Sequence, residues 1–229
     1  MPKCDPAREA RLAALEASGV LIPLWDGILI DETVAVAPGA TILPGSILRG
    51  ATVIGAGSVI GPGSVLTDAV IGENCTVRST YITASTLEDG VSIGPFSQVR
   101  PGCHIAAGCK IGDFVELKNS NLGEKTAVAH LTYVGDTDCG AGVNFGCGVA
   151  VANFNGKAKF RTTIGDGAFL GCNTNLVAPL ELGKRVLTAA GTTVTRNVPD
   201  GALCVARIRQ DNKEGWNDRR RRMHGQSAD

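Results

Sequence analysis

The stretch AVAHLTYVGDTDCGAGVNFGCG, residues 127–148, holds His130, one of only three histidines in the chain. An imidazole has an ordinary pKa near ~6.5, so it is the side chain best suited to accept a proton near neutral pH. His130 is therefore a candidate general base. A histidine among glycines and regularly spaced apolar residues is also a common structural hydrogen-bonding residue, so its position alone leaves both interpretations open.

Two basic residues, Arg100 and Lys118, are 18 residues apart. If the chain returns to the same face after 18 residues, their side chains stack one strand spacing apart, about 4.8 Å. Like charges so placed repel, and an anion such as a sugar phosphate would relieve the repulsion. Lys159 could close a third side of such a pocket. The alternative is that all three are solvated surface charges.

A six-residue repeat must position these groups. Glycine or another small residue often follows its aliphatic position, as in IGAGSV, IGPGSV and IGDGAF. Residues six apart lie on different faces of a helix, whereas a short strand and tight turn repeated every six residues point each aliphatic side chain inward. Three units complete an 18-residue coil, and stacked coils form a parallel β-helix. The aliphatic positions are Ile30, Val36, Ile42, Leu48, Ile54, Ile60 and Leu66, then Ile93, Val99, Ile105, Ile111 and Leu117, then Ile164, Leu170, Leu176, Leu182, Thr188 and Val194.

Three features interrupt the repeat. Residues 5–18 predict a short amphipathic helix, with Asp5 as N-cap and Pro6 at the first helical position, that covers the first coil. Residues 152–163 break the spacing between Val151 and Ile164, which predicts a projecting loop. After Val194 the period ends, which predicts an extended arm and a basic tail containing RRRR. The predicted parts are an N-terminal helix and cap (1–25), a β-helix domain (26–198) with a projecting loop at 152–163, and a C-terminal arm and tail (199–229).

Composition excludes several function classes. The 22 basic and 22 acidic residues balance, so nucleic acid is not an expected partner. No stretch approaches the ~20 apolar residues of a membrane helix, so we expect a cytoplasmic protein without a membrane partner. The eight cysteines lack CxxC pairs, which predicts reduced thiols and no metal site.

Several motifs, in one order from about residue 90 to 216, resemble the acetyltransferase domain of the bifunctional bacterial enzymes that make UDP-N-acetylglucosamine. These are RPG (100–102), GDFVELKNSNLG (112–123), AHLTYVGD (129–136), NFNGKAKFRTTIGD (153–166), NLVAPLELG (175–183), AAGTTVTRNVP (189–199) and ARIRQDNKEGW (206–216). The resemblance implies transfer of an acetyl group from acetyl-CoA to glucosamine 1-phosphate. It also implies left-handed winding, which the period alone does not fix.

The resemblance assigns roles residue by residue. It makes His130 of AHLTY the general base, and it assigns sugar-phosphate contacts to Arg100, Lys118, Tyr133, Asn144 and Lys159. It assigns acetyl-CoA contacts to Cys147, Asn153, Phe154, Cys172, Ala190 and Arg207. Phe154 and Asn155 replace the Tyr-Asp pair common in the family, and Cys172 stands where serine is frequent, which puts the affinity for acetyl-CoA in doubt.

The family further implies small-molecule substrates, no resident cofactor beyond acetyl-CoA as co-substrate, and a homotrimer with sites between subunits. No segment resembles the family's nucleotidyltransferase domain, so we do not expect uridylyl transfer. Two alternatives stay open: an acetyltransferase for a different amino sugar, and a non-catalytic scaffold. A zinc enzyme of the carbonic anhydrase type is disfavoured because it needs three clustered histidines, and the chain has only His104, His130 and His224.

Overall fold

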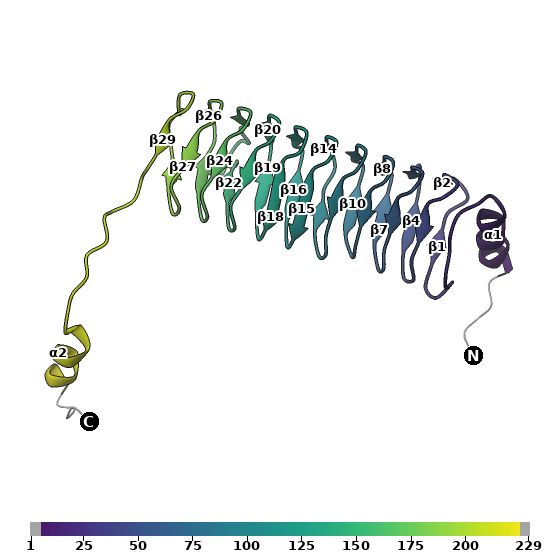
Figure 1. Cartoon of the computed structure of the whole chain (residues 1–229), viewed down its shortest axis with the longest axis horizontal. Coiled ribbons are helices and arrows are strands. Elements are labelled where there is room, and N and C mark those ends of the chain that lie inside the picture. Colours follow the sequence, from purple (N-terminus) through teal and green to yellow (C-terminus); the bar gives the residue numbers. More distant parts are fainter. Residues whose placement is uncertain (1–5, 225–229) are drawn as a thin grey trace.

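The computed structural model describes residues 6–224, which form an elongated prism with a helix over one end and an extended arm at the other (Figure 1). Three parallel sheets form the faces of the prism, with 10, 9 and 10 strands. Within each sheet a strand pairs with the strand three places later in the chain, except that β27 pairs with β29, so each complete coil contributes one strand to every face. The predicted all-β parallel β-helix is confirmed, and its form is consistent with the expected left-handed winding.

The first sheet comprises β1 (Leu29–Ile30), β4 (Ile47–Arg49), β7 (Val65–Thr67), β10 (Tyr81–Thr83), β13 (Gln98–Val99), β16 (Glu116–Lys118), β19 (Tyr133–Gly135), β22 (Ala150–Ala152), β25 (Asn175–Val177) and β28 (Thr193–Val194). The second comprises β2 (Ala35–Val36), β5 (Val53–Ile54), β8 (Val70–Ile71), β11 (Thr86–Leu87), β14 (His104–Ile105), β17 (Asn121–Leu122), β20 (Thr137–Cys139), β23 (Thr162–Ile164) and β26 (Leu180–Leu182). The third comprises β3 (Thr41–Ile42), β6 (Val59–Ile60), β9 (Thr76–Val77), β12 (Ser92–Ile93), β15 (Lys110–Asp113), β18 (Ala127–His130), β21 (Asn144–Phe145), β24 (Phe169–Leu170), β27 (Leu187–Thr188) and β29 (Leu203–Cys204).

The core is a set of aliphatic rows inside the prism, one row for each face. On the first sheet Leu48 pairs with Leu66, and Val99 pairs with Leu117, all of them at most 1% exposed. Each coil therefore buries its apolar residue against the coil before and after it, as the repeat predicts. Ile30 is only partly buried because it lies in the first coil.

Helix α1 (Pro6–Ala17) covers that first coil, within the predicted 5–18; Asp5 lies outside the described residues. Its apolar face buries Leu12 and Leu15 in the core. Arg8 donates a hydrogen bond to the Ile28 carbonyl (2.7 Å), and Arg11 donates one to the Val34 carbonyl (2.6 Å). The helix thus supplies donors to backbone carbonyls of the first coil.

The C-terminal end differs from the prediction. The repeat continues past Val194, because Val198 bridges to Leu182 and β29 pairs with β27 in the third sheet. Six-residue spacing fails there, yet backbone hydrogen bonds carry the chain around one more partial coil, including Leu187 N–H to the Ala202 carbonyl (2.9 Å). The ladder depends on the backbone, so it tolerates a change of side-chain period.

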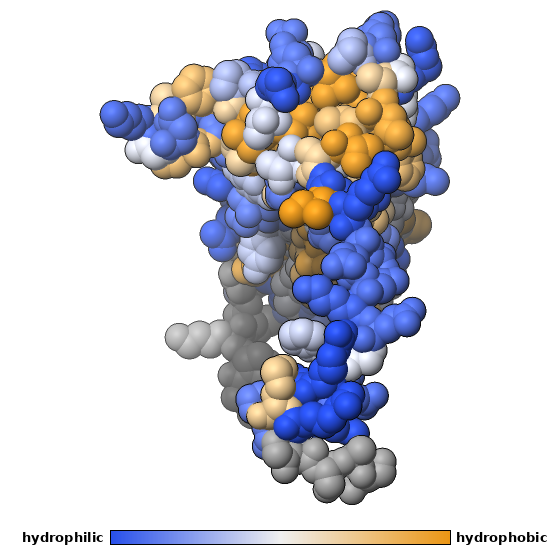
Figure 2. All heavy atoms as spheres, turned by 90° about the vertical axis from the view of Figure 1, so that its left-hand side faces the viewer, coloured by the Kyte–Doolittle hydropathy of each residue, from blue (hydrophilic) through white to orange (hydrophobic). Residues whose placement is uncertain are grey.

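Beyond β29 an arm leads to α2 (Trp216–Met223), which carries the four consecutive arginines (Figure 1). The predicted tail is thus helical here, consistent with the high helix propensity of arginine. Seen from this end, apolar atoms gather on the last part of the prism, while the arm and α2 are mostly hydrophilic (Figure 2). No helix within residues 6–224 is both long and apolar enough to cross a membrane.

Candidate functional site

His130 ends β18, directly beside Asp113 at the end of β15. The Nδ1 atom of His130 lies 3.1 Å from Oδ1 of Asp113, and the side chains are 58% and 41% exposed. The hydrogen bond from His130 lowers the pKa of Asp113, so the carboxylate stays ionised and holds the proton on Nδ1. The other ring nitrogen, Nε2, is then left to accept a proton.

A second group lies at the carboxyl ends of β16, β19 and β22 in the first sheet, around the buried carboxylate of Asp136. Its two oxygens accept hydrogen bonds from Asn119 (2.6 Å), Lys118 (3.3 Å) and Asn153. Burial disfavours the ionised carboxylate, but these three donors outweigh it, and the pKa of Asp136 lies below its ordinary value. We call Lys118, Asn119, Asp136 and Asn153 the Asp136 cluster.

The loop after β22 brings Lys159 to this cluster. Phe154 and Lys159 form an antiparallel bridge, so the loop is a small hairpin between Ala152 and Thr162. Lys118 contacts both Lys159 and Asp136, and these contacts raise the pKa of Lys118. The contact with Lys118 lowers the pKa of Lys159. Within residues 6–224 no carboxylate lies within ion-pair distance of Lys159.

Arg100 and Lys118 occupy matching positions in successive coils, as predicted, since the Arg100 N–H donates to the Leu117 carbonyl (2.8 Å). Their charges, however, are balanced internally. Arg100 pairs with Glu116 at 2.9 Å, which raises its pKa, and Lys118 pairs with Asp136. The unrelieved repulsion is therefore between Lys118 and Lys159, not between Arg100 and Lys118 as the 18-residue spacing suggests.

Tyr133 joins the same region from β19, where it pairs with Glu116. The Asn153 side-chain amide donates to the Tyr133 hydroxyl at 3.4 Å. Five predicted residues thus meet at this end of the first sheet, four assigned to the sugar phosphate and one, Asn153, assigned to acetyl-CoA. They are Arg100, Lys118, Tyr133, Asn153 and Lys159.

The other predicted residues follow the third sheet and the corner beyond it. Asn144 lies in β21, two strands along from β15, and pairs with Ala127 of β18. Cys147, Cys172 and Ala190 occupy one corner in successive coils, since the Asn173 N–H donates to the Cys147 carbonyl and the Gly191 N–H to the Cys172 carbonyl, each at 2.8 Å. Arg207 lies in the arm beside that corner, its Cδ 3.9 Å from where a Cβ on Gly191 would stand. Phe154 is exposed on the hairpin.

His130 lies where β18 of the third sheet leads into β19 of the first, whereas Asp136 lies where β19 leads into β20 of the second, so the two groups lie at different corners of the prism. Among the described residues no side-chain hydrogen bond or ion pair connects the His130 side with the Asp136 cluster. Three functional candidates were missed by sequence reasoning, namely Asp113, Glu116 and Asp136. The available signal was coil spacing, because Asp113 precedes His130 by 17 residues and Asp136 follows Lys118 by 18.

An apolar ridge runs along the corner next to His130. It consists of Phe96, Phe114 and Leu131, which are 63%, 55% and 60% exposed. The two phenyl rings stack with centroids 5.7 Å apart. All three residues have positive φ (58°, 54° and 45°), a conformation that large apolar residues rarely adopt. A row of large exposed apolar residues of this kind is typical of an interaction surface.

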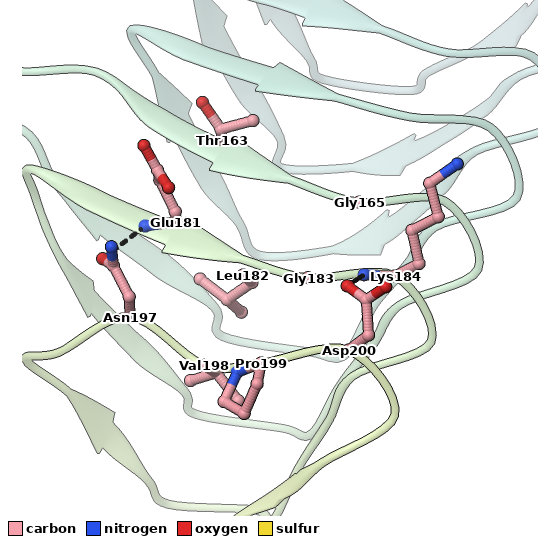
Figure 3. A pocket seen from close by; sticks show the side chains of 10 residues that line it. All are labelled: Thr163, Gly165, Glu181, Leu182, Gly183, Lys184, Asn197, Val198, Pro199 and Asp200. Carbon is pink, nitrogen blue, oxygen red and sulfur yellow. Dashed lines mark hydrogen bonds between the residues drawn. The ribbon is translucent and has the colours of Figure 1, made fainter.

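A hollow near the C-terminal end of the second sheet lies apart from these groups (Figure 3). Hydrogen bonds close its turns: the Glu181 N–H donates to Asn197 Oδ1 (2.9 Å) and the Lys184 N–H to Asp200 Oδ1 (2.8 Å). None of the predicted site residues lines it. Its polar side chains hold the last coils together.

Comparison with known proteins agrees with the repeat and the motifs. The family described as bacterial transferase hexapeptide (six repeats) matches residues 84–119. The bifunctional protein GlmU of Caldicellulosiruptor saccharolyticus is 49% identical over 157 residues, 69% of this chain and 34% of that protein. The chain is a hexapeptide-repeat protein homologous to part of GlmU. GlmU of Clostridium acetobutylicum is 48% identical over 67% of this chain and 34% of that protein, so the chain spans about a third of these relatives.

Among solved structures, the UDP-N-acetylglucosamine acyltransferase of Francisella novicida is similar, with 18% identity and a TM-score of 0.45. The alignment covers 90% of this chain and 74% of that one.

Within residues 6–224 no three His, Cys, Asp or Glu side chains are grouped closely enough to hold a metal ion.

Proposed function

We propose that the protein transfers an acetyl group from acetyl-CoA to the amine of glucosamine 1-phosphate. The observation that carries the proposal is the aligned His130–Asp113 pair, which provides an oriented base in a chain that is 49% identical to a GlmU over 157 residues. Acetyl-CoA is a co-substrate in this proposal, and the proposal includes a cytoplasmic location, where reduced cysteines persist.

The chemistry requires one proton acceptor at the amine. The neutral amine of the sugar attacks the thioester carbonyl, and Nε2 of His130 takes the proton that the nitrogen loses as the C–N bond forms. Collapse of the tetrahedral intermediate breaks the C–S bond, and the imidazolium returns the proton to the leaving thiolate of CoA. Asp113 keeps the ring oriented and stabilises the imidazolium.

The Asp136 cluster and its neighbours supply a site for the phosphate. Arg100, Lys118 and Lys159 bring three positive charges, while Glu116 and Asp136 bring two negative ones. The excess charge is Lys159, whose pKa is lowered by contact with Lys118. A phosphate dianion between the two ammonium groups would remove their repulsion and accept hydrogen bonds from both.

We also propose a homotrimer whose copies pack along the apolar ridge. The ridge adjoins His130, and within one chain the His130 side and the Asp136 cluster share no side-chain hydrogen bond or ion pair among residues 6–224. A neighbouring copy that covers Phe96 and Phe114 would bring its own surface beside His130 and enclose the site.

The test is a thiol-release assay on the purified chain with glucosamine 1-phosphate and acetyl-CoA. We expect free CoA without added metal, and no pyrophosphate after addition of UTP and Mg²⁺. A panel containing glucosamine, glucosamine 6-phosphate and nucleotide-linked amino sugars tests the acceptor. If the protein is folded and releases CoA only with another acceptor, the alternative amino sugar is correct; if it releases none, the scaffold interpretation is correct.

A further inference from the structure

Two cysteines that the proposed chemistry does not use lie side by side. Cys147 follows β21 and Cys172 follows β24, and the register of these strands, Phe145 with Leu170, continues through both turns. The Asn173 N–H donates to the Cys147 carbonyl at 2.8 Å, and a Cβ on Gly146 would approach the Cys172 nitrogen to 2.6 Å. Cys147 and Cys172 therefore stack directly on each other.

Their separation suits a covalent bridge. Stacked positions in neighbouring strands lie about 4.8 Å apart at Cα. Disulfides in proteins span Cα separations of about 4.4–6.8 Å. Both residues lie in turns beside glycines, Gly146, Gly148 and Gly171, whose backbone can adjust to bring the two sulfur atoms together.

Among the cysteines within residues 6–224, this pair is also the more accessible one. Cys172 is exposed and Cys147 is partly exposed, whereas Cys75, Cys103, Cys109 and Cys139 are buried. Burial raises the pKa of these four thiols, to about 12 for Cys139, so they stay protonated and unreactive. Cys204 is partly exposed, but it pairs with Thr188 in the third sheet and is therefore two residues out of register with Cys147 and Cys172.

We propose that Cys147 and Cys172 form a dithiol modification site that a peroxide closes to a disulfide. The thiolate of Cys172 attacks one oxygen of the peroxide, the O–O bond breaks, and sulfenic acid and hydroxide form. The thiol of Cys147 then attacks the sulfenic sulfur, the S–O bond breaks, and water leaves with the disulfide in place. Two thiols are oxidised and one peroxide is reduced to two waters.

A consequence for activity rests on the proposed function. The resemblance assigns both side chains to the binding of acetyl-CoA, so a bridge between them would alter that surface and lower the turnover. A dithiol reductant would restore it, because the exchange reopens the two thiols. The site then acts as a reversible oxidative switch on the acetyl donor.

The chemical test is peptide mapping after brief treatment of the reduced protein with hydrogen peroxide and capping of the remaining thiols. Cleavage after Lys125 and Lys157 leaves Cys147 with Cys139, and cleavage after Arg161 and Lys184 isolates Cys172. We expect a disulfide that links these two peptides through Cys147. Fragmentation of the first peptide between Cys139 and Cys147 shows which of its two cysteines forms the link. The protein should lose the mass of two hydrogen atoms, and Cys147→Ser or Cys172→Ser should abolish the link while Cys204→Ser retains it.

Acetyl-CoA then separates this proposal from the proposed function. For each variant, the activity after peroxide is divided by its own activity before, and we expect a loss of about tenfold in the unmodified protein and little loss in Cys172→Ser. Slower cross-linking with acetyl-CoA present supports both proposals. Cross-linking that acetyl-CoA does not slow keeps the dithiol site and refutes the assigned donor surface. Oxidation of Cys172 to sulfinic acid without a link overturns the dithiol site, whatever the activity.

Discussion

Replacing Asp136 with Asn tests whether the buried carboxylate is the internal counter-ion of the site. Asp136 has a positive φ of 49°, a conformation that Asn adopts as readily, so the backbone is undisturbed. In the wild type both carboxylate oxygens accept hydrogen bonds, from Lys118, Asn119 and Asn153. In the variant one oxygen becomes an NH₂ group that faces donors only, and the charge beside Lys118 is gone.

The expected cost follows from burial. The Asp136 side chain is 6% exposed and that of Lys118 is 17% exposed. Breaking one side of a buried ion pair costs about 3–5 kcal/mol, and the residual water contact of Lys118 and the 3.3 Å separation reduce this to about 2–3 kcal/mol. Asp138→Asn is the matched control, since its pair with Arg161 is 41% exposed on both sides and should be worth about 0.2–1 kcal/mol.

Urea unfolding followed by far-ultraviolet circular dichroism measures both variants at equal protein concentration. We expect the Asp136→Asn midpoint to fall clearly below that of Asp138→Asn, with similar slopes. Raising the salt concentration should shrink the difference between Asp138→Asn and the wild type but leave the Asp136→Asn difference nearly unchanged. Equal losses in the two variants would refute the argument that burial of Asp136 sets its contribution.

The same carboxylate predicts a pH dependence with a definite sign. Its pKa in the folded chain lies below the ordinary 3.8, so the folded state holds its proton less tightly than the unfolded state does. The stability it contributes is fully present above that ordinary value and is lost as the pH falls through the lower folded pKa. Wild-type unfolding midpoints should therefore drop more steeply below about pH 4 than those of Asp136→Asn. Parallel curves would contradict this assignment.

The remaining predictions concern catalysis and assembly. His130→Ala should lower turnover by about 10²- to 10⁴-fold with little change in substrate binding, and an unchanged rate would remove it from the mechanism. Asp113→Ala should lower turnover by about tenfold while Asp113→Asn, which still accepts the Nδ1 hydrogen bond, loses less; equal losses would argue against orientation. Arg100→Ala and Lys118→Ala should weaken sugar-phosphate binding by about 1.5–3 kcal/mol, measured by calorimetry, and a loss confined to acetyl-CoA would reverse the division of the site. Light scattering should give a trimer mass that Phe114→Ser reduces; a stable, active wild-type monomer would refute the ridge interface.

The six-residue period was enough to predict the coil because it depends on inward-pointing side chains, which the sequence displays directly. It could not predict β29, where the backbone ladder continues although the aliphatic spacing is lost between Val194 and Leu203. It also could not predict α2, because no repeat or apolar stripe marks that segment. Periodicity therefore predicts the middle of a solenoid well and its end poorly.

The candidate site divides in the same way. His130 and Lys118 could be proposed from residue type and motif, but their carboxylate partners could be found only through coil spacing, since Asp113 and Asp136 belong to the neighbouring coils, 17 and 18 residues away in opposite directions. Which residues meet across coils depends on the register, and coils in this chain differ in length, as the pairs Val65 with Tyr81 and Leu29 with Ile47 show.

Register also explains why the repulsion that the 18-residue spacing suggests between Arg100 and Lys118 is balanced in the structure by carboxylate partners. Stacking Arg100 on Lys118 assumed that no other charge lies near them, yet in each case the next coil supplies a carboxylate, Glu116 to Arg100 and Asp136 to Lys118. Lys159 reaches this level from a hairpin that interrupts the repeat, so it brings a charge with no carboxylate partner among residues 6–224. In a repetitive fold, coils can balance their own charges, and an inserted loop is the place where an unbalanced one is added. In the proposed function, the unbalanced charge that a phosphate would neutralise is therefore added by the loop and not by the repeat.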